Sequence, residues 1–327
     1  MERMKEERKT YCISHGKDVD GIASASIVKL ANGGKTFLVN YDKIIETLEN
    51  IPDNANVYVC DLGMNDSISE RFIEECNRIT KKGKFTYIDH HILKPSTKKN
   101  ILKAKVKLIH SRKECAGVLT YELLKKKVPK EAAILACYAA ITDYMDHQQI
   151  AKSLISNYDR QLVLLESTML AYALAYDGAK PQFGNKIVDA FQELSFPHEI
   201  KDVPELANKQ AERMKNIMKI VNKEAKSYKN FACMESSNPT IGLVANMIIG
   251  ELNVPVAFAY RHNTINGHYE MSFRARYNSK AELGKIVAKI TPELGGMGGG
   301  HNKACGARIP DNKLNKFIKL FSAELNK

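Results

Sequence analysis

No tryptophan, no CxxC pair and no long apolar run occur in this 327-residue chain. Without tryptophan, few large aromatic surfaces are available for bases to stack on. The seven cysteines are scattered and odd in number, which argues against a disulfide framework and against a zinc ribbon. We expect them to be small buried residues in a reducing cytoplasm.

The sequence also shows no segment with the pattern of a membrane helix or of a secretion signal. The longest apolar stretch, residues 132–141, is well short of the roughly 20 residues that a membrane helix needs. The N-terminal segment MERMKEERKT is charged and lacks the apolar centre of a signal peptide. We therefore expect a cytoplasmic protein without a membrane partner.

What the chain has in excess is positive charge. Lysine and arginine total 49 against 37 aspartate and glutamate residues, which gives a formal net charge of +12. Cations close to phosphates release condensed counterions, and the release favours binding. The excess charge therefore indicates a polyanionic partner.

Short apolar runs alternate with helical patterns in the first half of the chain. Strands are predicted at residues 10–14, 36–39, 57–60, 85–88 and 106–109, and helices at 22–31, 42–49, 67–82, 115–127 and 130–141. This alternation predicts a parallel sheet with right-handed crossovers. In such sheets the binding crevice lies at the carboxyl ends of the strands, so polar side chains there should converge.

The second half follows a different pattern. Residues 148–200 are predicted to be helical, and residues 204–228 form a predicted long helix with an apolar packing stripe in the position of a connector. Further strands are predicted at 231–236, 256–262, 268–276 and 307–309, and further helices at 242–252, 280–290 and from 312 onward. The predicted fold is α/β: a parallel-sheet domain, a helical linker and a smaller α/β domain, with the active site in the cleft between the domains.

Acidic and imidazole side chains follow the ends of several predicted strands or helices. The candidates are His15, Asp18, Asp20, Asp61, Asp89, His90, His91 and Asp143. Crowded carboxylates repel one another, and divalent cations are the usual remedy. The mixture of carboxylate and imidazole favours manganese, with magnesium as the alternative, and argues against structural zinc. Two such ions a few ångströms apart are a known device for phosphoryl hydrolysis, in which a bridging hydroxide attacks.

A family resemblance rests on these motifs taken together. Asp18-Val19-Asp20-Gly21, Asp61, Asp89-His90-His91 and Asp143 are followed by Gly298-Gly299-Gly300-His301 and Gly306. This series resembles the DHH phosphoesterase superfamily with its DHH-associated C-terminal domain, in the right order and over nearly the whole chain. In size and layout the chain is most similar to archaeal RecJ-like and bacterial nanoRNase-type (NrnA) exonucleases. The resemblance implies a DHH catalytic domain over 1–200, a helical linker over 201–228 and a DHH-associated substrate-binding domain over 229–327.

The resemblance also implies roles in the first domain. Asp18 would bind one ion, Asp20, His90 and Asp143 the other, and Asp61 would bridge the two. His91 would face the scissile phosphate, and Asp89 completes the catalytic triplet. For His15 two interpretations stay open, a metal ligand or a loop residue behind the ligands, because family members usually place this histidine one residue further from the first aspartate.

In the second domain the resemblance assigns substrate contacts. His301 would reach the scissile phosphate, and Arg274 in Ser272-Phe273-Arg274 would bind a nucleotide phosphate. The run Gly298, Gly299 and Gly300 would either approach a phosphate closely or fill turns. Cys305 stands where the family usually has alanine, and we interpret it as a small residue and not as a nucleophile.

The expected activity is hydrolysis of short single-stranded RNA or DNA to nucleoside 5′-monophosphates, from the 3′ end. Alternatives are a phosphatase for a small nucleotide such as 3′-phosphoadenosine 5′-phosphate, a cyclic-dinucleotide phosphodiesterase and, less favoured, a replication-associated scaffold. A pyrophosphatase is disfavoured, because Ser111-Arg112-Lys113 lies in the first domain, whereas that signature belongs to the second. Replication factors remain candidate partners, and a monomer and a homodimer both remain open.

Overall fold

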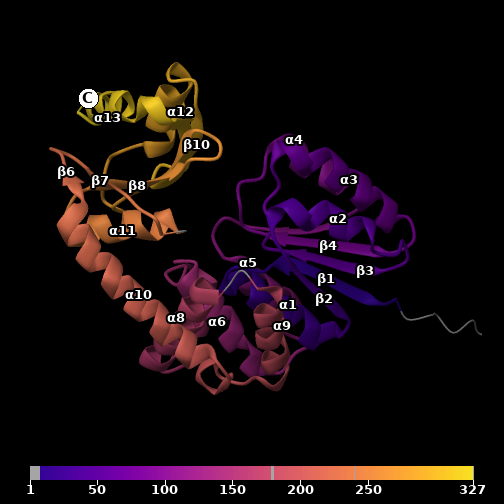
Figure 1. Cartoon of the computed structure of the whole chain (residues 1–327). Coiled ribbons are helices and arrows are strands. Elements are labelled where there is room, and N and C mark those ends of the chain that lie inside the picture. The colour runs from indigo at the N-terminus through magenta and orange to yellow at the C-terminus, as the bar shows by residue number, and fades with distance from the viewer. Residues whose placement is uncertain (1–7, 178–179, 239, 327) are drawn as a thin grey trace, which may run out of the picture. The chain divides into compact units, whose positions relative to one another are not determined.

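The computed structural model describes residues 8–177, 180–238 and 240–326 (Figure 1). The chain divides into two compact units, with the boundary between Ala211 and Glu212. In the described ranges, no helix combines the length and the hydrophobicity that a membrane crossing requires. All seven cysteines are free and buried, as expected.

Unit 1 is built on a fully parallel sheet of five strands in the order β2-β1-β3-β4-β5. The strands are β1 (Thr10–His15), β2 (Lys35–Val39), β3 (Asn56–Cys60), β4 (Lys84–Asp89) and β5 (Lys107–His110). All five strands lie within a residue or two of their predicted positions, because each is a short apolar run bounded by polar residues. The parallel-sheet prediction is confirmed.

Helices cover both faces of this sheet, as Figure 1 shows. One face packs against α2 (Ile44–Glu49), α3 (Asp66–Thr80) and α4 (Pro95–Lys103) around a core that contains Phe72 and Tyr87. The other face packs against α1 (Val19–Asn32), α5 (Ala116–Leu124) and α9 (Pro181–Ala190). Three further helices, α6 (Ala133–Thr142), α7 (Gln149–Ile155) and α8 (Arg160–Asp177), pack on that side against other helices. Residues 148–200, for which the sequence leaves core helices and a lid both open, therefore form core helices on this side of the sheet.

Helix α10 (Val203–Glu224) contains the boundary between the units. Its predicted packing stripe is partly correct, since Ile217 and Val221 are buried whereas Met218 is 39% exposed. The predicted end at residue 228 is wrong. The helix stops at Glu224, and Lys226–Ser227 forms the short strand β6, which pairs with the next strand, β7.

Unit 2 has a six-stranded mixed sheet in the order β10-β11-β9-β8-β7-β6. Its other strands are β7 (Ala232–Glu235), β8 (Val256–Asn263), β9 (His268–Ala275), β10 (Met297–Gly300) and β11 (Ala304–Pro310), and its helices are α11 (Ile241–Glu251), α12 (Leu283–Glu293) and α13 (Leu314–Leu325). The glycine run is not only a turn, because Met297–Gly300 pairs with β11 as an edge strand. A side chain at Gly298 would lie 2.6 Å from Val287, so close packing against α12 accounts for that glycine.

Candidate metal centre

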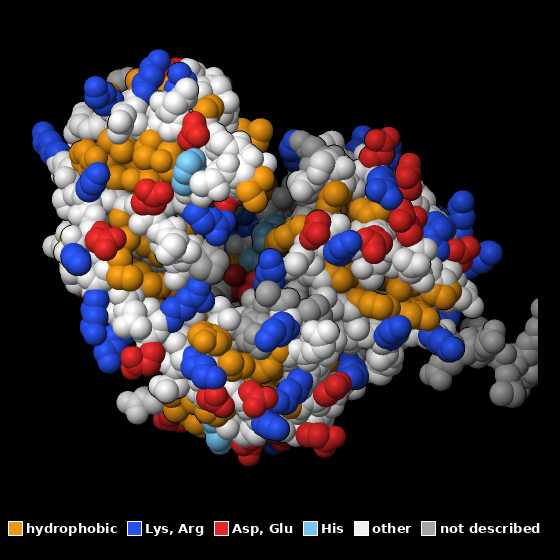
Figure 2. Space-filling model, in the orientation of Figure 1, with side chains coloured by type: hydrophobic (Ala, Val, Ile, Leu, Met, Phe, Trp, Pro, Cys, Tyr) orange, Lys and Arg blue, Asp and Glu red, His pale blue; other side chains and the backbone are white. Residues whose placement is uncertain are grey.

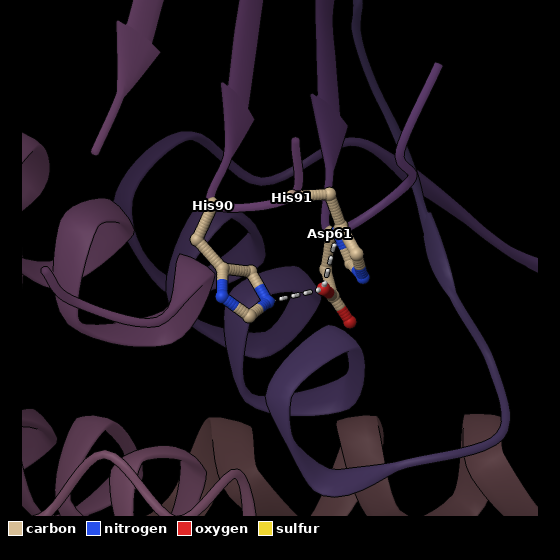
Figure 3. A group of neighbouring side chains, drawn as sticks. All are labelled: Asp61, His90 and His91. Atoms are coloured by element: carbon tan, nitrogen blue, oxygen red, sulfur yellow. Dashed lines mark ion pairs between the residues drawn. The ribbon is translucent and has the colours of Figure 1, made fainter. Parts of the chain in front are cut away.

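Three strands of unit 1 end at the same polar cluster. Strand β1 ends at His15, Asp61 follows β3, and β4 ends at Asp89 with His90 and His91 directly after it. The strand order reverses direction between β1 and β3, which is the point where open parallel sheets bind ligands. Figure 3 shows Asp61, His90 and His91 together just beyond the ends of the strands.

Asp61 lies at the middle of the cluster and is almost fully buried, with 2% exposure. Its Oδ1 is 3.4 Å from Nε2 of His90, and its Oδ2 is 3.6 Å from Nδ1 of His15. Its backbone has φ 55°, a left-handed conformation that non-glycine residues adopt rarely and at a cost. The two oxygens of one carboxylate therefore face histidines on opposite sides.

Three groups of side chains could each hold a cation. They are His15 with Asp18 and Asp61, Asp20 with His90 and Asp143, and Asp61 with His90 and His91. Within each group the ligand atoms lie within 4.8 Å of one another. Because Asp61 belongs to two groups and His90 to two, the cluster fits neighbouring divalent ions better than isolated ones.

The start of α1 positions the DxD pair. Asp18 is the N-cap of the helix and accepts a hydrogen bond from the N–H of Gly21 at 3.1 Å, while its other oxygen lies 2.8 Å from Nδ1 of His15. Asp20 lies inside α1, which begins at Val19, three residues before the predicted start at residue 22. Its buried carboxylate accepts hydrogen bonds from the backbone N–H groups of Ala116, at 2.9 Å, and Gly117, at 2.6 Å, at the start of α5.

Asp89 has a different environment from the candidate ligands. One oxygen lies 2.8 Å from Nδ1 of His91, and the other accepts from the Tyr87 hydroxyl at 3.1 Å and from the His91 N–H at 3.2 Å. The carboxylate is 1% exposed and belongs to none of the three groups. It therefore orients His91, whose Nε2 lies 3.4 Å from the Tyr41 hydroxyl.

The cluster perturbs the protonation of its members. Burial, followed by the charges of Asp20 and Asp18, raises the pKa of Asp61 to about 7. Burial and the charge of Asp20 likewise raise the pKa of Asp143 to about 7. Burial opposes the charged imidazoles, but the surrounding carboxylates outweigh it and raise the pKa of His15 to about 10 and that of His90 to about 9. Protons would thus partly neutralise the cluster, and a bound cation would displace them.

In unit 2 the predicted phosphate-binding side chains share one strand. Arg274 donates to the Ser272 hydroxyl at 3.0 Å and to the Phe273 carbonyl at 2.9 Å, both from β9. A side chain at Gly242, in the first turn of α11, would lie 2.5 Å from the Arg274 guanidinium. Arg274, Ser272 and the start of α11 are therefore close together, and helix N-termini favour anions.

The remaining predicted residues of unit 2 lie around the β10–β11 turn. His301 is exposed, and its N–H donates to the Ala304 carbonyl at 2.9 Å. The register aligns Gly299 with Gly306 and Gly306 with Ser272 across three strands. Burial raises the pKa of the Cys305 thiol to about 12, which supports its interpretation as a non-nucleophilic residue.

Tyr41, Tyr87, Ala116 and Gly117 were absent from the sequence prediction. Ala116 and Gly117 act through backbone amides, which carry no residue-type signal, and Asp20 meets them across 96 and 97 residues of chain. Tyr87 stands two residues before Asp89 in a strand, so the same-face alternation of strands could have indicated it. Tyr41 lies in a short 3₁₀ turn, Tyr41–Lys43, with no comparable signal.

Two family models match the chain. Residues 9–151 match the N-terminal domain of the DHH family, and residues 231–327 match the DHHA1 domain. The chain belongs to the DHH phosphoesterase superfamily. This membership makes it a phosphoester hydrolase, and the DHH motif that names the family is Asp89-His90-His91.

Solved structures with the same fold have low sequence identity to this DHH chain. A DHH-domain protein described as a member of the S1p family of ribosomal proteins is 16% identical, with a TM-score of 0.72 over 98% of this chain and 87% of that one. The pGpG-specific phosphodiesterase PggH from Vibrio cholerae is 14% identical, with a TM-score of 0.63 over 98% and 99%. RecJ from Thermus thermophilus in complex with Mn²⁺ is 15% identical, with a TM-score of 0.65 over 99% of this chain and 53% of that one. No curated protein matches the sequence.

Proposed function

We propose that this protein is a two-ion phosphodiesterase that removes nucleoside 5′-monophosphates from short single-stranded RNA or DNA. The observation that carries the proposal is the position of Asp61, whose two oxygens face His15 on one side and His90 on the other. A carboxylate placed in this way suits a bridge between two divalent ions. Its left-handed backbone is a conformational cost of the kind found at functional sites.

The donor set fits the proposed cofactor. Asp18 with His15 would hold one ion, and Asp20, His90 and Asp143 the other. The mixed imidazole and carboxylate donors favour manganese, with magnesium as the alternative. When bound, the ions would lower the pKa of water and share the charge that develops at the phosphate.

The remaining residues of the triplet and of unit 2 would act on the substrate. Asp89 holds Nδ1 of His91, which leaves Nε2 of that imidazole to face the scissile phosphate. In unit 2, Arg274 beside the start of α11 would bind a nucleotide phosphate, and His301 would contact the phosphate under attack. Gly299 and Gly300, next to His301, would let the backbone approach that phosphate closely.

A nucleic-acid substrate is supported by the net charge of +12 and by one exposed aromatic ring. Tyr144 follows Asp143 directly and is 83% exposed, so its ring is available to a base. The second candidate substrate is a small nucleotide or dinucleotide, because the structural match to the pGpG-specific phosphodiesterase covers 98% of this chain and 99% of that one. The proposal for short single strands includes digestion from the 3′ end.

An activity panel with manganese separates these substrates. It compares short RNA, short single-stranded DNA, 3′-phosphoadenosine 5′-phosphate, cyclic diadenylate, pGpG and pyrophosphate. We expect the highest kcat/KM on the short single strands, and a 5′-labelled RNA should give a ladder of shortening labelled products. Immediate release of a labelled mononucleotide would contradict the polarity, and turnover of the small nucleotides alone would replace the substrate assignment.

A further inference from the structure

Unit 1 has a concave surface at the amino ends of its strands, at the opposite edge of the sheet from the metal centre. This amino-edge depression has a volume of about 1130 Å³. Six cationic side chains line it, and all are exposed: Arg8, Lys9, Lys35, Lys84, Lys107 and Lys127. Among the described residues that line it, none is acidic. On the face shown in Figure 2, in contrast, lysine and arginine are interspersed with aspartate and glutamate.

Four of the six cations lie at or next to the first residue of a strand, so they form a row along the edge of the sheet. Lys35, Lys84 and Lys107 are the first residues of β2, β4 and β5, and Lys9 directly precedes β1. Strands lie about 4.8 Å apart, so the row across the five strands is about 19 Å long. No ion pair with an acidic residue in the described ranges neutralises these lysines. A single phosphate could contact only part of such a row, whereas a chain of phosphates could contact all of it.

We propose that the amino-edge depression binds the sugar-phosphate backbone of single-stranded nucleic acid. Tyr11, which is half-buried, also lines it, and its ring stacks on Phe37 with 6.5 Å between centroids. Tyr58 lines it as well but is only 7% exposed, so its ring belongs to the core. A partly exposed aromatic ring beside a row of cations suits single-stranded nucleic acid, whose bases can contact the ring, whereas an inorganic polyanion makes no such contact. Nζ of Lys35 lies 4.9 Å from the centroid of the Phe37 ring, so the cations and the Tyr11–Phe37 pair are neighbours.

This surface is distinct from the catalytic one. The metal cluster stands at the carboxyl ends of the same strands, and strands of five or six residues separate the two edges by about 17–20 Å. One phosphate therefore cannot contact both. The depression adds an anchoring site for nucleic acid longer than the short substrates of the metal centre, and it does not depend on the proposed reaction.

The test compares two triple variants of the full chain. Lys35→Gln/Lys84→Gln/Lys107→Gln removes three cations from the depression, and Lys130→Gln/Lys201→Gln/Lys223→Gln removes three exposed lysines that do not line it. Binding of a fluorescent polyuridine strand is followed by anisotropy in chelator, at several salt concentrations. Hydrolysis of a dinucleotide in manganese is measured in parallel.

We expect the first variant to bind the strand about tenfold or more weakly, with the slope of log K against log salt reduced by about 2, since each single-strand phosphate contact contributes about 0.7. The control variant should keep at least most of the wild-type slope, and dinucleotide hydrolysis should be unchanged in both. Equal affinity and slope in the two triple variants would overturn the proposal. So would tighter binding of duplex than of single strand, or displacement by inorganic polyphosphate as effective as by RNA of equal charge.

Discussion

Asp61 is the residue on which the metal centre depends most. It is buried between two histidines, has a left-handed backbone and carries a carboxyl whose pKa is raised to about 7. Each of these features costs stability in the free protein, and a divalent ion would offset the electrostatic part. Asp143, on the other side of His90, shares only the raised pKa of about 7, and a divalent ion would offset that cost in the same way.

The protonation of the cluster predicts how stability depends on pH. Asp61 and Asp143, with pKa values of about 7, hold protons more tightly than in the unfolded chain, so their stabilisation is lost as pH rises from about 4 to about 7. His90 and His15 stabilise the folded protein below about pH 6.5 and lose that contribution as pH rises through their pKa values, about 9 for His90 and about 10 for His15. All four shifts have the same sign.

In chelator, therefore, the melting temperature should be several degrees lower at about pH 8 than at about pH 5. Manganese should remove this difference, because it replaces the protons and binds more tightly as pH rises. Thermal unfolding at both pH values, with and without manganese, checks this. A metal-free protein that is more stable at the higher pH would contradict the assigned protonation.

Asp89 is predicted to position His91 and not to bind metal. Asp89→Asn should keep the manganese affinity but lower kcat by about 10–100-fold, the usual effect of losing an orienting partner. Burial lowers the pKa of His91, but Asp89 outweighs burial and raises it. Without the carboxylate, the limb of the pH–rate profile that reports His91 should move to lower pH. Loss of manganese binding, or an unmoved profile with full activity, would argue against this role.

At the scale of elements, the turn from β1 into α1 positions the candidate metal ligands His15, Asp18 and Asp20. A side chain at Gly21 would lie 2.2 Å from the His15 carbonyl oxygen, so strand and helix can approach only with glycine there. Gly21→Ala should destabilise the protein by about 1–3 kcal/mol and weaken manganese binding. Gly250→Ala in α11 is the matched control, since nothing lies within 4 Å of its added carbon, and it should be neutral or stabilising by about 0.5–1 kcal/mol. Equal melting temperatures for the two variants would refute the close approach.

The sequence allowed the parallel sheet and its polar edge to be predicted because both are local patterns. Short apolar runs bounded by polar residues marked all five strands, and strand-end chemistry marked Asp61 and the triplet. Element ends were harder to place: Asp18 could have been recognised as an N-cap, which would have moved the start of α1 to Val19. Strand β10 was missed because glycine has low strand propensity and only pairing with β11 makes the strand. The amides that hold Asp20 depend on tertiary structure alone.

At the scale of the whole molecule, unit 1 is expected to bind the metal ions and unit 2 to contact the substrate. His301→Ala should lower kcat/KM on short RNA at least tenfold while leaving manganese binding unchanged, because His301 belongs to unit 2 and is exposed. Arg274→Lys should raise KM more than it lowers kcat, since lysine keeps the charge but loses the bidentate fork. Steady-state kinetics and a manganese titration check both. Full activity in His301→Ala would remove that residue from the mechanism.

The central claim is a pair of divalent ions joined by Asp61. Manganese titration by calorimetry, together with electron paramagnetic resonance of the loaded protein, tests it most directly in the wild type and in Asp61→Asn, which keeps the side-chain size and tolerates the left-handed backbone. We expect two ions per wild-type chain with an exchange-coupled spectrum. Asp61→Asn should lose the coupling, at least one ion and nearly all phosphodiesterase activity. A wild-type chain that binds one isolated ion, or an Asp61→Asn protein with unchanged stoichiometry and turnover, would contradict the claim.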